Sequence, residues 1–276
     1  MQVVVTGASG FLGQALLRCL AQAGVPCLGV SRRTQPGLLQ VADYEQAPAG
    51  DVLVHLAESS DRAAVNQRGA AAEAQALATL DALLAKDYRQ VVYASSAVLY
   101  GDRGATPRKV ADPVEVVDAY TRIKLASERA VLARNGSVAR LANLYGPGMS
   151  TGNVLSHLLG QLGTGATITL HTLEPVRDFL WIDDAAQALA AIVARDARGL
   201  FNLGSGQGSS IRQLAAIAQQ AAGTRQAVVE RQAAAAPSSL VLDIADTCAA
   251  LGWSPRTSLA EGIARLVNKK PDPVTP

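Results

Sequence analysis

A tyrosine and a lysine four residues apart, Tyr120 and Lys124 in the segment YTRIK, form a pair suited to acid–base chemistry. On a helix this spacing places both side chains on one face. Tyrosine is a weak base near neutral pH, but a neighbouring ammonium group stabilises its phenolate. Tyr120 can then exchange a proton with a substrate hydroxyl while a hydride moves at the adjacent carbon. Because Y-x-x-x-K also occurs often by chance, the pair alone leaves a purely structural role open.

Two serines, Ser95 and Ser96 in YASSAVLYG, stand where a predicted strand ends. Ligands of parallel α/β sheets bind at the carboxyl edge of the strands, so a hydroxyl there can hold the substrate oxygen in line with the tyrosine. The alternative is a serine that only caps the backbone at its strand end, which is common.

The elements that must position these residues alternate between short apolar strands and longer helices. Strands are predicted at QVVV, PCLGV, DVLVHLA and QVVYASS, and another over 137–146. Helices are predicted over 10–23 and about 118–135, with a long one before QVVYASS. This order predicts an α/β fold, a Rossmann-type doubly wound parallel sheet.

The glycine-rich segment TGASGFLG lies between the first strand and the first helix. Gly7, Gly10 and Gly13 allow a tight turn and a close approach of the backbone, and the helix N-terminus then faces an anion, normally a diphosphate. A glycine-containing turn without a ligand is the alternative, but strand, loop and helix all fall where a dinucleotide-binding unit requires them.

The second predicted strand ends in VSRR, where an acidic residue would be typical for a cofactor with a free ribose 2′-hydroxyl. Ser31 stands there instead, and Arg32 and Arg33 follow. Paired guanidinium groups suit a 2′-phosphate, so we expect NADP in preference to NAD. If the arginines are only solvated loop charges, either cofactor binds.

After residue 146 the elements become shorter and less regular, which predicts a smaller, partly interleaved C-terminal α/β region. We expect 1–146 to form the cofactor-binding domain, which also receives part of 177–205. Residues 147–176 and 206–268 are expected to form the substrate-binding region, and the proline-rich segment 269–276 a disordered tail.

The composition favours a globular protein that acts on small molecules. Of 276 residues 49% are hydrophobic, and the formal net charge is only +2, so neither nucleic acid nor a membrane is expected as a partner. Three scattered cysteines lack metal-ligand spacing, so no metal site is predicted, and they fit buried thiols in a reducing compartment. Without a signal-peptide pattern at the N-terminus, we expect a cytoplasmic protein.

Taken in order, the motifs resemble those of the extended short-chain dehydrogenase/reductases, or NAD-dependent epimerase/dehydratase family, which include nucleotide-sugar 4-epimerases and 4-keto reductases. The resemblance covers nearly the whole chain. It is carried by TGASGFLG (6–13), HLAES (55–59), SSAVLYG (95–101), YTRIK (120–124), RLANLYGPG (140–148), RDFLWIDDAAQAL (177–189), FNLGSGQGSSI (201–211) and LGWSPRTSLAEGI (251–263).

The resemblance implies a role for each matching residue. Ser96, Tyr120 and Lys124 take the catalytic positions, with Tyr120 as acid/base and Lys124 binding the nicotinamide ribose. Asn143 and Arg177 take substrate positions, the arginine facing a diphosphate; a local ion pair with Asp178 is the alternative for Arg177. Together with the arguments above, the predicted cofactor-binding set is Gly7, Gly10, Phe11, Leu12, Gly13, Ser31, Arg32, Arg33, Asp43, Leu56, Ala57, Glu58, Tyr120 and Lys124.

Departures from the family pattern narrow the expected reaction. Ala97 and Val98 replace the acidic pair of the 4,6-dehydratases, and no cysteine lies near Ser96 to epimerise carbons beside a ketone. A 4-epimerase or a reductase remains, and the apparent NADP preference favours an NADPH-dependent reductase of a 4-keto nucleotide sugar. HTLEPV before Arg177 departs from the usual Gly-rich turn, so a non-nucleotide carbonyl substrate stays open. A non-catalytic NADP-sensing protein is the remaining alternative.

Two further expectations concern the helices around the site. The family's Asn-x-x-Gly-Thr pattern is not matched at the expected distance from Ser96, and Asn66 lies too early in the chain to be equated with its asparagine. The segment ASERAVLA (126–133) has enough apolar surface for a helix–helix contact between subunits, and we expect a homodimer.

Overall fold

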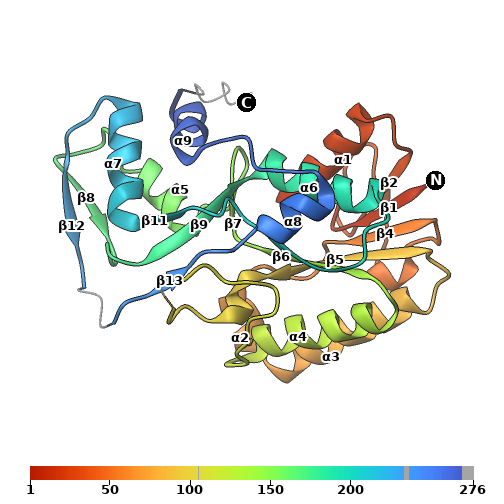
Figure 1. Ribbon diagram of the computed structural model, residues 1–276. Coiled ribbons are helices and arrows are strands. Elements are labelled where there is room, and N and C mark those ends of the chain that lie inside the picture. Colours follow the sequence, from red (N-terminus) through yellow and green to blue (C-terminus); the bar gives the residue numbers. More distant parts are fainter. Residues whose placement is uncertain (105, 233–235, 269–276) are drawn as a thin grey trace.

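Seven parallel strands form the central sheet of the computed structural model, which describes residues 1–104, 106–232 and 236–268. The strand order is β10-β6-β5-β4-β1-β2-β3, which places β1 and β4 in the middle (Figure 1). The strands are β1 Val3–Thr6, β2 Cys27–Ser31, β3 Leu39–Gln40, β4 Val52–His55, β5 Gln90–Ser96, β6 Ser137–Leu141 and β10 Gly199–Leu203. The predicted Rossmann-type fold is confirmed.

Helices cover both faces of this sheet, as its buried apolar strands require. On one face α1 (Phe11–Gln22) packs against α6 (Ile182–Ala194), and on the other α3 (Ala70–Leu84) packs against α4 (Ala119–Ala133) (Figure 1). In β1 and β4 all four residues of each strand are buried, so the apolar runs read from the sequence form the core.

The long helix predicted before β5 is two helices. The short α2 (Arg62–Arg68) and α3 meet at Gly69, whose φ of +53° is a conformation that favours glycine. This break lets α2 leave the line of α3 and contact the start of α4.

The single strand predicted over 137–146 is wrong in its second half. β6 ends at Leu141, opposite Ser96, where the neighbouring β5 gives way to a 3-10 turn, η2 (Ala97–Tyr100). Without that partner the chain leaves the sheet, and β7 (Asn143–Tyr145) pairs with β9 (Val176–Trp181) instead. The chain therefore passes from one sheet to another at Ala142.

The second sheet and its helices lie beside the carboxyl edge of β6 and β10 (Figure 1). β9 also pairs with β11 (Gly208–Ser210) and β13 (Ser239–Leu240), and β8 (Thr167–Leu170) pairs with β12 (Ala227–Glu230). The remaining elements are α5 Val154–Leu159, α7 Ile211–Ala222, α8 Ala245–Leu251, α9 Leu259–Asn268 and the 3-10 turn η1 Tyr44–Gln46. The predicted tail 269–276 lies outside the described residues.

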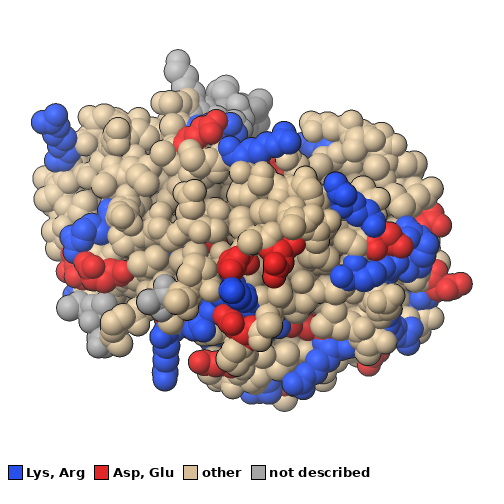
Figure 2. Space-filling model, viewed as in Figure 1, with Lys and Arg blue, Asp and Glu red and all other residues tan. Residues whose placement is uncertain are grey.

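Charged side chains of both signs are interspersed on the face shown in Figure 2. Among the described helices none is long and apolar enough to span a bilayer. In the same part of the chain no group of three or more His, Cys, Asp or Glu side chains is placed to hold a metal ion.

Candidate active site

The glycine loop after β1 is closed by backbone contacts that leave no room for side chains. Gly7 has a φ of +73°, and a Cβ there would lie 2.6 Å from the carbonyl oxygen of Leu56. Gly10 caps α1 without a side-chain hydrogen bond, so the first N–H groups of the helix are left for another acceptor. This is a cradle suited to the diphosphate of a dinucleotide.

Gly13 gives the sharpest test of that cradle. A Cβ at Gly13 would collide with the backbone of Gly7 and would lie 2.8 Å from Cα of Ala8. Because backbone cannot rotate away, we expect Gly13→Ala to lower the free energy of unfolding by about 1–3 kcal/mol, measured by urea denaturation.

The matched control for Gly13→Ala is Gly165→Ala, since a Cβ at Gly165 meets nothing within 4 Å. That variant is expected to stay within about 0.5 kcal/mol of the wild type. A Gly13→Ala protein as stable as Gly165→Ala would show that the loop tolerates a side chain.

A pocket runs along the carboxyl edge of the sheet from β2 to α4. Six of the predicted cofactor-binding residues line it, namely Arg32, Asp43, Ala57, Glu58, Tyr120 and Lys124. The other predicted site residues do not line it, namely the glycine-loop residues Gly7, Gly10, Phe11, Leu12 and Gly13, and Ser31, Arg33, Leu56, Ser96, Asn143 and Arg177. The six lie on four separate segments, and α2 and α3 supply further lining residues.

At one end of the pocket Arg32 and Ser31 take different roles. Ser31 is fully buried, and its hydroxyl donates to Ser9 Oγ at 2.7 Å. The Arg32 guanidinium lies over the ring of Tyr44, 5.3 Å from its centroid, and lines the pocket. Asp43 caps η1 by accepting the N–H of Glu45 and also lines the pocket. Of the predicted arginine pair, one faces this space.

His55, the last residue of β4, is a buried polar group with an unused atom. Its Nδ1 is 2.7 Å from the Thr6 hydroxyl, while Nε2 has no hydrogen-bond partner within the described part of the chain. Burial lowers the pKa of His55 to about 4, so the ring is neutral at pH 7. His55 is also one of the residues that line the pocket.

The lowered pKa of His55 predicts acid destabilisation in a defined window. As the pH falls below about 6.5 the unfolded chain takes up a proton that the folded chain accepts only near pH 4, so stability is lost between these values. Between pH 7 and pH 5 we expect the protonation of His55 to lower the free energy of unfolding by about 2 kcal/mol, measured by urea unfolding.

In His55→Gln that part of the loss disappears, whatever the variant's stability at pH 7. His157, which is exposed on α5, provides the control, and His157→Gln is expected to lose as much as the wild type. Equal losses in His55→Gln and the wild type would contradict the prediction.

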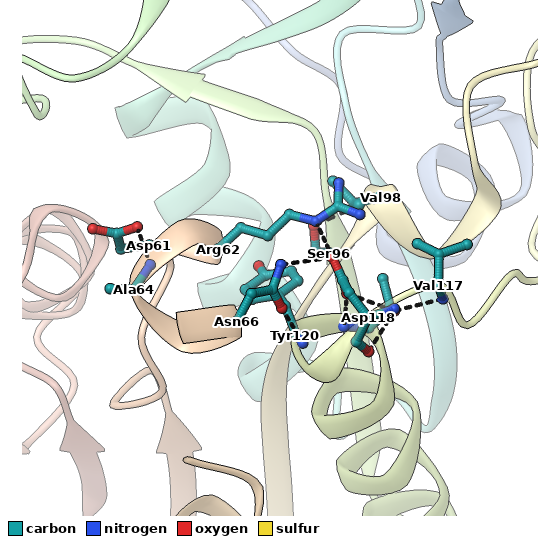
Figure 3. A network of polar contacts seen from close by, with 10 residues as sticks. Asp61, Arg62, Ala64, Asn66, Ser96, Val98, Val117, Asp118 and Tyr120 are labelled. Atoms are coloured by element: carbon teal, nitrogen blue, oxygen red, sulfur yellow. Dashed lines mark hydrogen bonds and ion pairs between the residues drawn. The ribbon is translucent and has the colours of Figure 1, made fainter. Parts of the chain in front are cut away.

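Tyr120 is held by the first turn of α4. Asp118 and Thr121 form a reciprocal capping box there, which fixes where the helix begins. From α2, the Asn66 side-chain oxygen accepts the Tyr120 backbone N–H at 3.0 Å, and its Nδ2 donates to Asp118 at 2.8 Å (Figure 3). Arg62 donates to the same carboxylate at 2.6 Å. Asn66 thus supports the Tyr120 backbone, a role that motif spacing did not predict.

Lys124 lies one turn further along α4 and is buried. Its ammonium donates to the Ala94 carbonyl at 2.9 Å and pairs with Glu58 at 3.0 Å. It lies 5.8 Å from the centroid of the Tyr120 ring. Burial acts to lower the pKa of Lys124, but the Glu58 carboxylate outweighs it and holds the pKa above its ordinary value. Lys124 is therefore a charged group beside the tyrosine.

The two serines at the end of β5 have separate partners. Ser95 is buried and donates to Glu128, which also pairs with Arg140. Ser96 accepts the Val98 backbone N–H at 3.3 Å, the capping bond of a strand-end serine, and its hydroxyl hydrogen is free to be donated elsewhere. Figure 3 shows Ser96 in the same close view as Tyr120, across from α2.

The two predicted substrate residues lie on β7 and β9. Asn143 is exposed and donates to the Asp178 carbonyl at 3.1 Å. Arg177 pairs with Asp102 at 3.0 Å and donates to Ser238 at 2.7 Å. The alternative of an ion pair between Arg177 and Asp178 is wrong, because the buried Asp178 carboxylate accepts from Ser205, Gly206 and Leu242 instead.

The residues present fit a nicotinamide dinucleotide. The glycine cradle suits its diphosphate, Lys124 offers donors to its ribose, and His55, which lines the pocket, has a buried Nε2 without a partner among the described residues. With Tyr120 beside them, these residues can couple a proton transfer to a hydride transfer between cofactor and substrate.

Comparisons with known proteins agree with this class of site. The model of the NAD dependent epimerase/dehydratase family matches residues 3–204. A dTDP-6-deoxy-L-talose 4-dehydrogenase (NAD(P)(+)) of Kitasatospora kifunensis is 26% identical, over 96% of this chain and 94% of its own.

Two solved structures have the same fold. A UDP-glucose 4-epimerase of Thermotoga maritima with UDP-glucose matches with a TM-score of 0.84 at 21% identity, over 97% of each chain. RMD from Pseudomonas aeruginosa complexed with NADPH gives 0.83 at 23% identity, over 96% of this chain and 97% of its own.

Fold and comparisons together define an NAD(P)-dependent enzyme built on a dinucleotide-binding sheet. The chain belongs to the NAD-dependent epimerase/dehydratase family, within the extended short-chain dehydrogenase/reductases.

Proposed function

We propose that the protein is an NADPH-dependent reductase of a keto group on a nucleotide-activated sugar. The observation that carries the cofactor preference is Arg32, which lines the pocket just after β2, where the strand ends in serine and arginine instead of an acidic residue. A guanidinium at this position can make charge-assisted hydrogen bonds to a 2′-phosphate. NADPH in turn favours net reduction.

In this proposal each residue has a stated task. When bound, the nicotinamide supplies the hydride that adds to the carbonyl carbon. Tyr120 donates its phenolic proton to the carbonyl oxygen, Ser96 donates a hydrogen bond to the same oxygen, and Lys124 stabilises the phenolate that remains. A proton from solvent then restores the phenol. The glycine loop holds the diphosphate of the cofactor.

Substrate binding is assigned to the region after residue 146. We place the boundaries at 147–176 and 206–268, with 1–146 and part of 177–205 as the cofactor domain. The dehydrogenase of Kitasatospora kifunensis, which spans 96% of this chain, acts at position 4 of a dTDP-sugar by its name, and this supports a 4-keto nucleotide sugar. A homodimer and a cytoplasmic location stay predictions.

A nucleotide-sugar 4-epimerase is the second candidate, favoured by the likeness to the UDP-glucose 4-epimerase of Thermotoga maritima. A third candidate is a reductase of a carbonyl compound that carries no nucleotide, and the contacts of Arg177 favour it. Because its guanidinium is paired with Asp102, a substrate diphosphate would have to share or displace that carboxylate.

The test is NADPH oxidation, followed at 340 nm, with a panel of dTDP- and UDP-4-keto sugars and simple ketones. We expect consumption with at least one keto nucleotide sugar, faster with NADPH than with NADH. Interconversion of sugar epimers without net NADPH loss would favour the epimerase. Cofactor binding without turnover across the panel, unaltered by Tyr120→Phe, would favour an NADP sensor.

A further inference from the structure

Glu58 lines the pocket but has no role in the proposed reaction. It follows the HLA segment just after β4, and its side chain is only 8% exposed. One carboxylate oxygen accepts the Ser127 hydroxyl at 2.9 Å, and the other accepts from Tyr93 at 2.5 Å and pairs with Lys124 at 3.0 Å. Residues of two elements, β5 and α4, therefore fix this carboxylate in the pocket wall.

The carboxylate stays charged in this setting. Burial acts to raise the pKa of Glu58, but the charge of Lys124 and the hydrogen bonds outweigh it and hold the pKa below its ordinary value. The ionisable groups that act on it are Lys124 from α4, Tyr93 from β5 and His55 from β4. Burial raises the pKa of Tyr93 and lowers that of His55, so both are neutral at pH 7 and Lys124 is the charge that balances Glu58.

Charge balance matters here because the two forms of the cofactor differ in charge at one place. The nicotinamide ring is cationic when oxidised and neutral when reduced. An unbalanced ammonium in the pocket would therefore weaken binding of the oxidised form relative to the reduced one, and a carboxylate has the opposite effect. Glu58 and Lys124 both line the same pocket as Tyr120.

We propose that Glu58 is a positioning residue that compensates the charge of Lys124, so that the site binds the oxidised cofactor as readily as the reduced one. The carboxylate, itself held by Ser127 and Tyr93, also fixes the ammonium at its position 5.8 Å from the centroid of the Tyr120 ring. This inference rests on the proposed use of the pocket by the cofactor, and it assigns to Glu58 an effect on the ratio of two affinities rather than on binding itself.

The test measures dissociation constants of NADP⁺ and NADPH by calorimetry for the wild type and three variants. In Glu58→Gln the ratio of the NADP⁺ constant to the NADPH constant is expected to rise about tenfold, which corresponds to about 30 mV in the potential of the bound couple. In Lys124→Gln the ratio is expected to fall by a similar factor. The double variant has no net change of charge and is expected to return near the wild-type ratio.

The control is Glu73→Gln, which makes the same change of charge on α3. Glu73 pairs with Arg122 at the surface and does not line the pocket, so its ratio is expected to match the wild type. Circular dichroism and thermal unfolding check each fold. If Glu58→Gln fails to fold because Lys124 is left unpaired, the effect of removing the Glu58 charge is obtained by comparing the affinity ratio of the double variant with that of Lys124→Gln.

An unchanged ratio in folded Glu58→Gln, with both affinities weakened equally, would assign Glu58 a structural role and overturn the inference while leaving the proposed function intact. A fall in the ratio would overturn it as well. A wild-type protein that binds neither NADP⁺ nor NADPH would overturn both the inference and the proposed function.

Discussion

Replacing Tyr120 by phenylalanine is expected to lower turnover by about a hundredfold or more while cofactor affinity stays nearly unchanged. In the proposed reaction the phenol gives a proton to the substrate oxygen, and in the variant the ring remains in the pocket wall near Lys124. Steady-state kinetics gives the turnover, and calorimetric titration with NADPH gives the affinity.

Tyr88→Phe is the matched control for this prediction, because it removes a phenolic oxygen elsewhere. Tyr88 donates to the Pro48 carbonyl and does not line the pocket, so turnover is expected to equal that of the wild type. A Tyr120→Phe enzyme with full turnover would remove Tyr120 from the acid/base role. A large loss of NADPH affinity would instead indicate that the phenol mainly holds the cofactor.

The helix of Tyr120 shows why this residue could be predicted and its support could not. Spacing alone puts Tyr120 and Lys124 on one face of α4, and the capping residues Asp118 and Thr121 stand beside them in the sequence. Asn66 lies far away in the chain, in a short helix that exists because Gly69 breaks the predicted long one. No local sequence pattern indicates in which direction α2 turns away from α3 at Gly69.

The strands also show which features local sequence predicts and which depend on residues far away in the chain. Apolar runs predicted the parallel core correctly, because strands covered on both faces must be apolar throughout. The end of β6 depends on where its neighbour β5 ends, so the turn away from the sheet at Ala142 follows from strand pairing rather than from the run itself. A prediction from the residues of 137–146 alone had no access to that neighbour.

Charged partners were the least predictable part of the site. Glu58 pairs with Lys124, and Arg177 pairs with Asp102 rather than with the adjacent Asp178. An ion pair depends on which side chains the fold brings within reach, and sequence proximity is a poor guide to it because neighbouring strand residues point to opposite faces. The structure thus places Arg177 in contact with Asp102 and Ser238, which are both distant from it in the sequence.

The second large effect is expected for Arg32→Ala, in which NADP affinity falls by about tenfold to a hundredfold while NAD affinity stays the same. Hydrogen bonds to charged groups contribute about 1.5–3 kcal/mol, which corresponds to these factors. The guanidinium is already oriented by the Tyr44 ring, 5.3 Å from its centroid, so little side-chain entropy is lost on binding a 2′-phosphate. Calorimetry with both cofactors measures the change.

Arg33→Ala is the matched control, since Arg33 carries the same charge at the next position but does not line the pocket. Its effect on NADP affinity is expected to be about threefold or less, the size of a screened surface charge. An equal loss in both variants would mean that the pair acts only through its general positive field. Equal affinity of the wild type for NAD and NADP would remove the reason to prefer a reductase, because an epimerase that returns its own hydride gains nothing from a cofactor kept reduced.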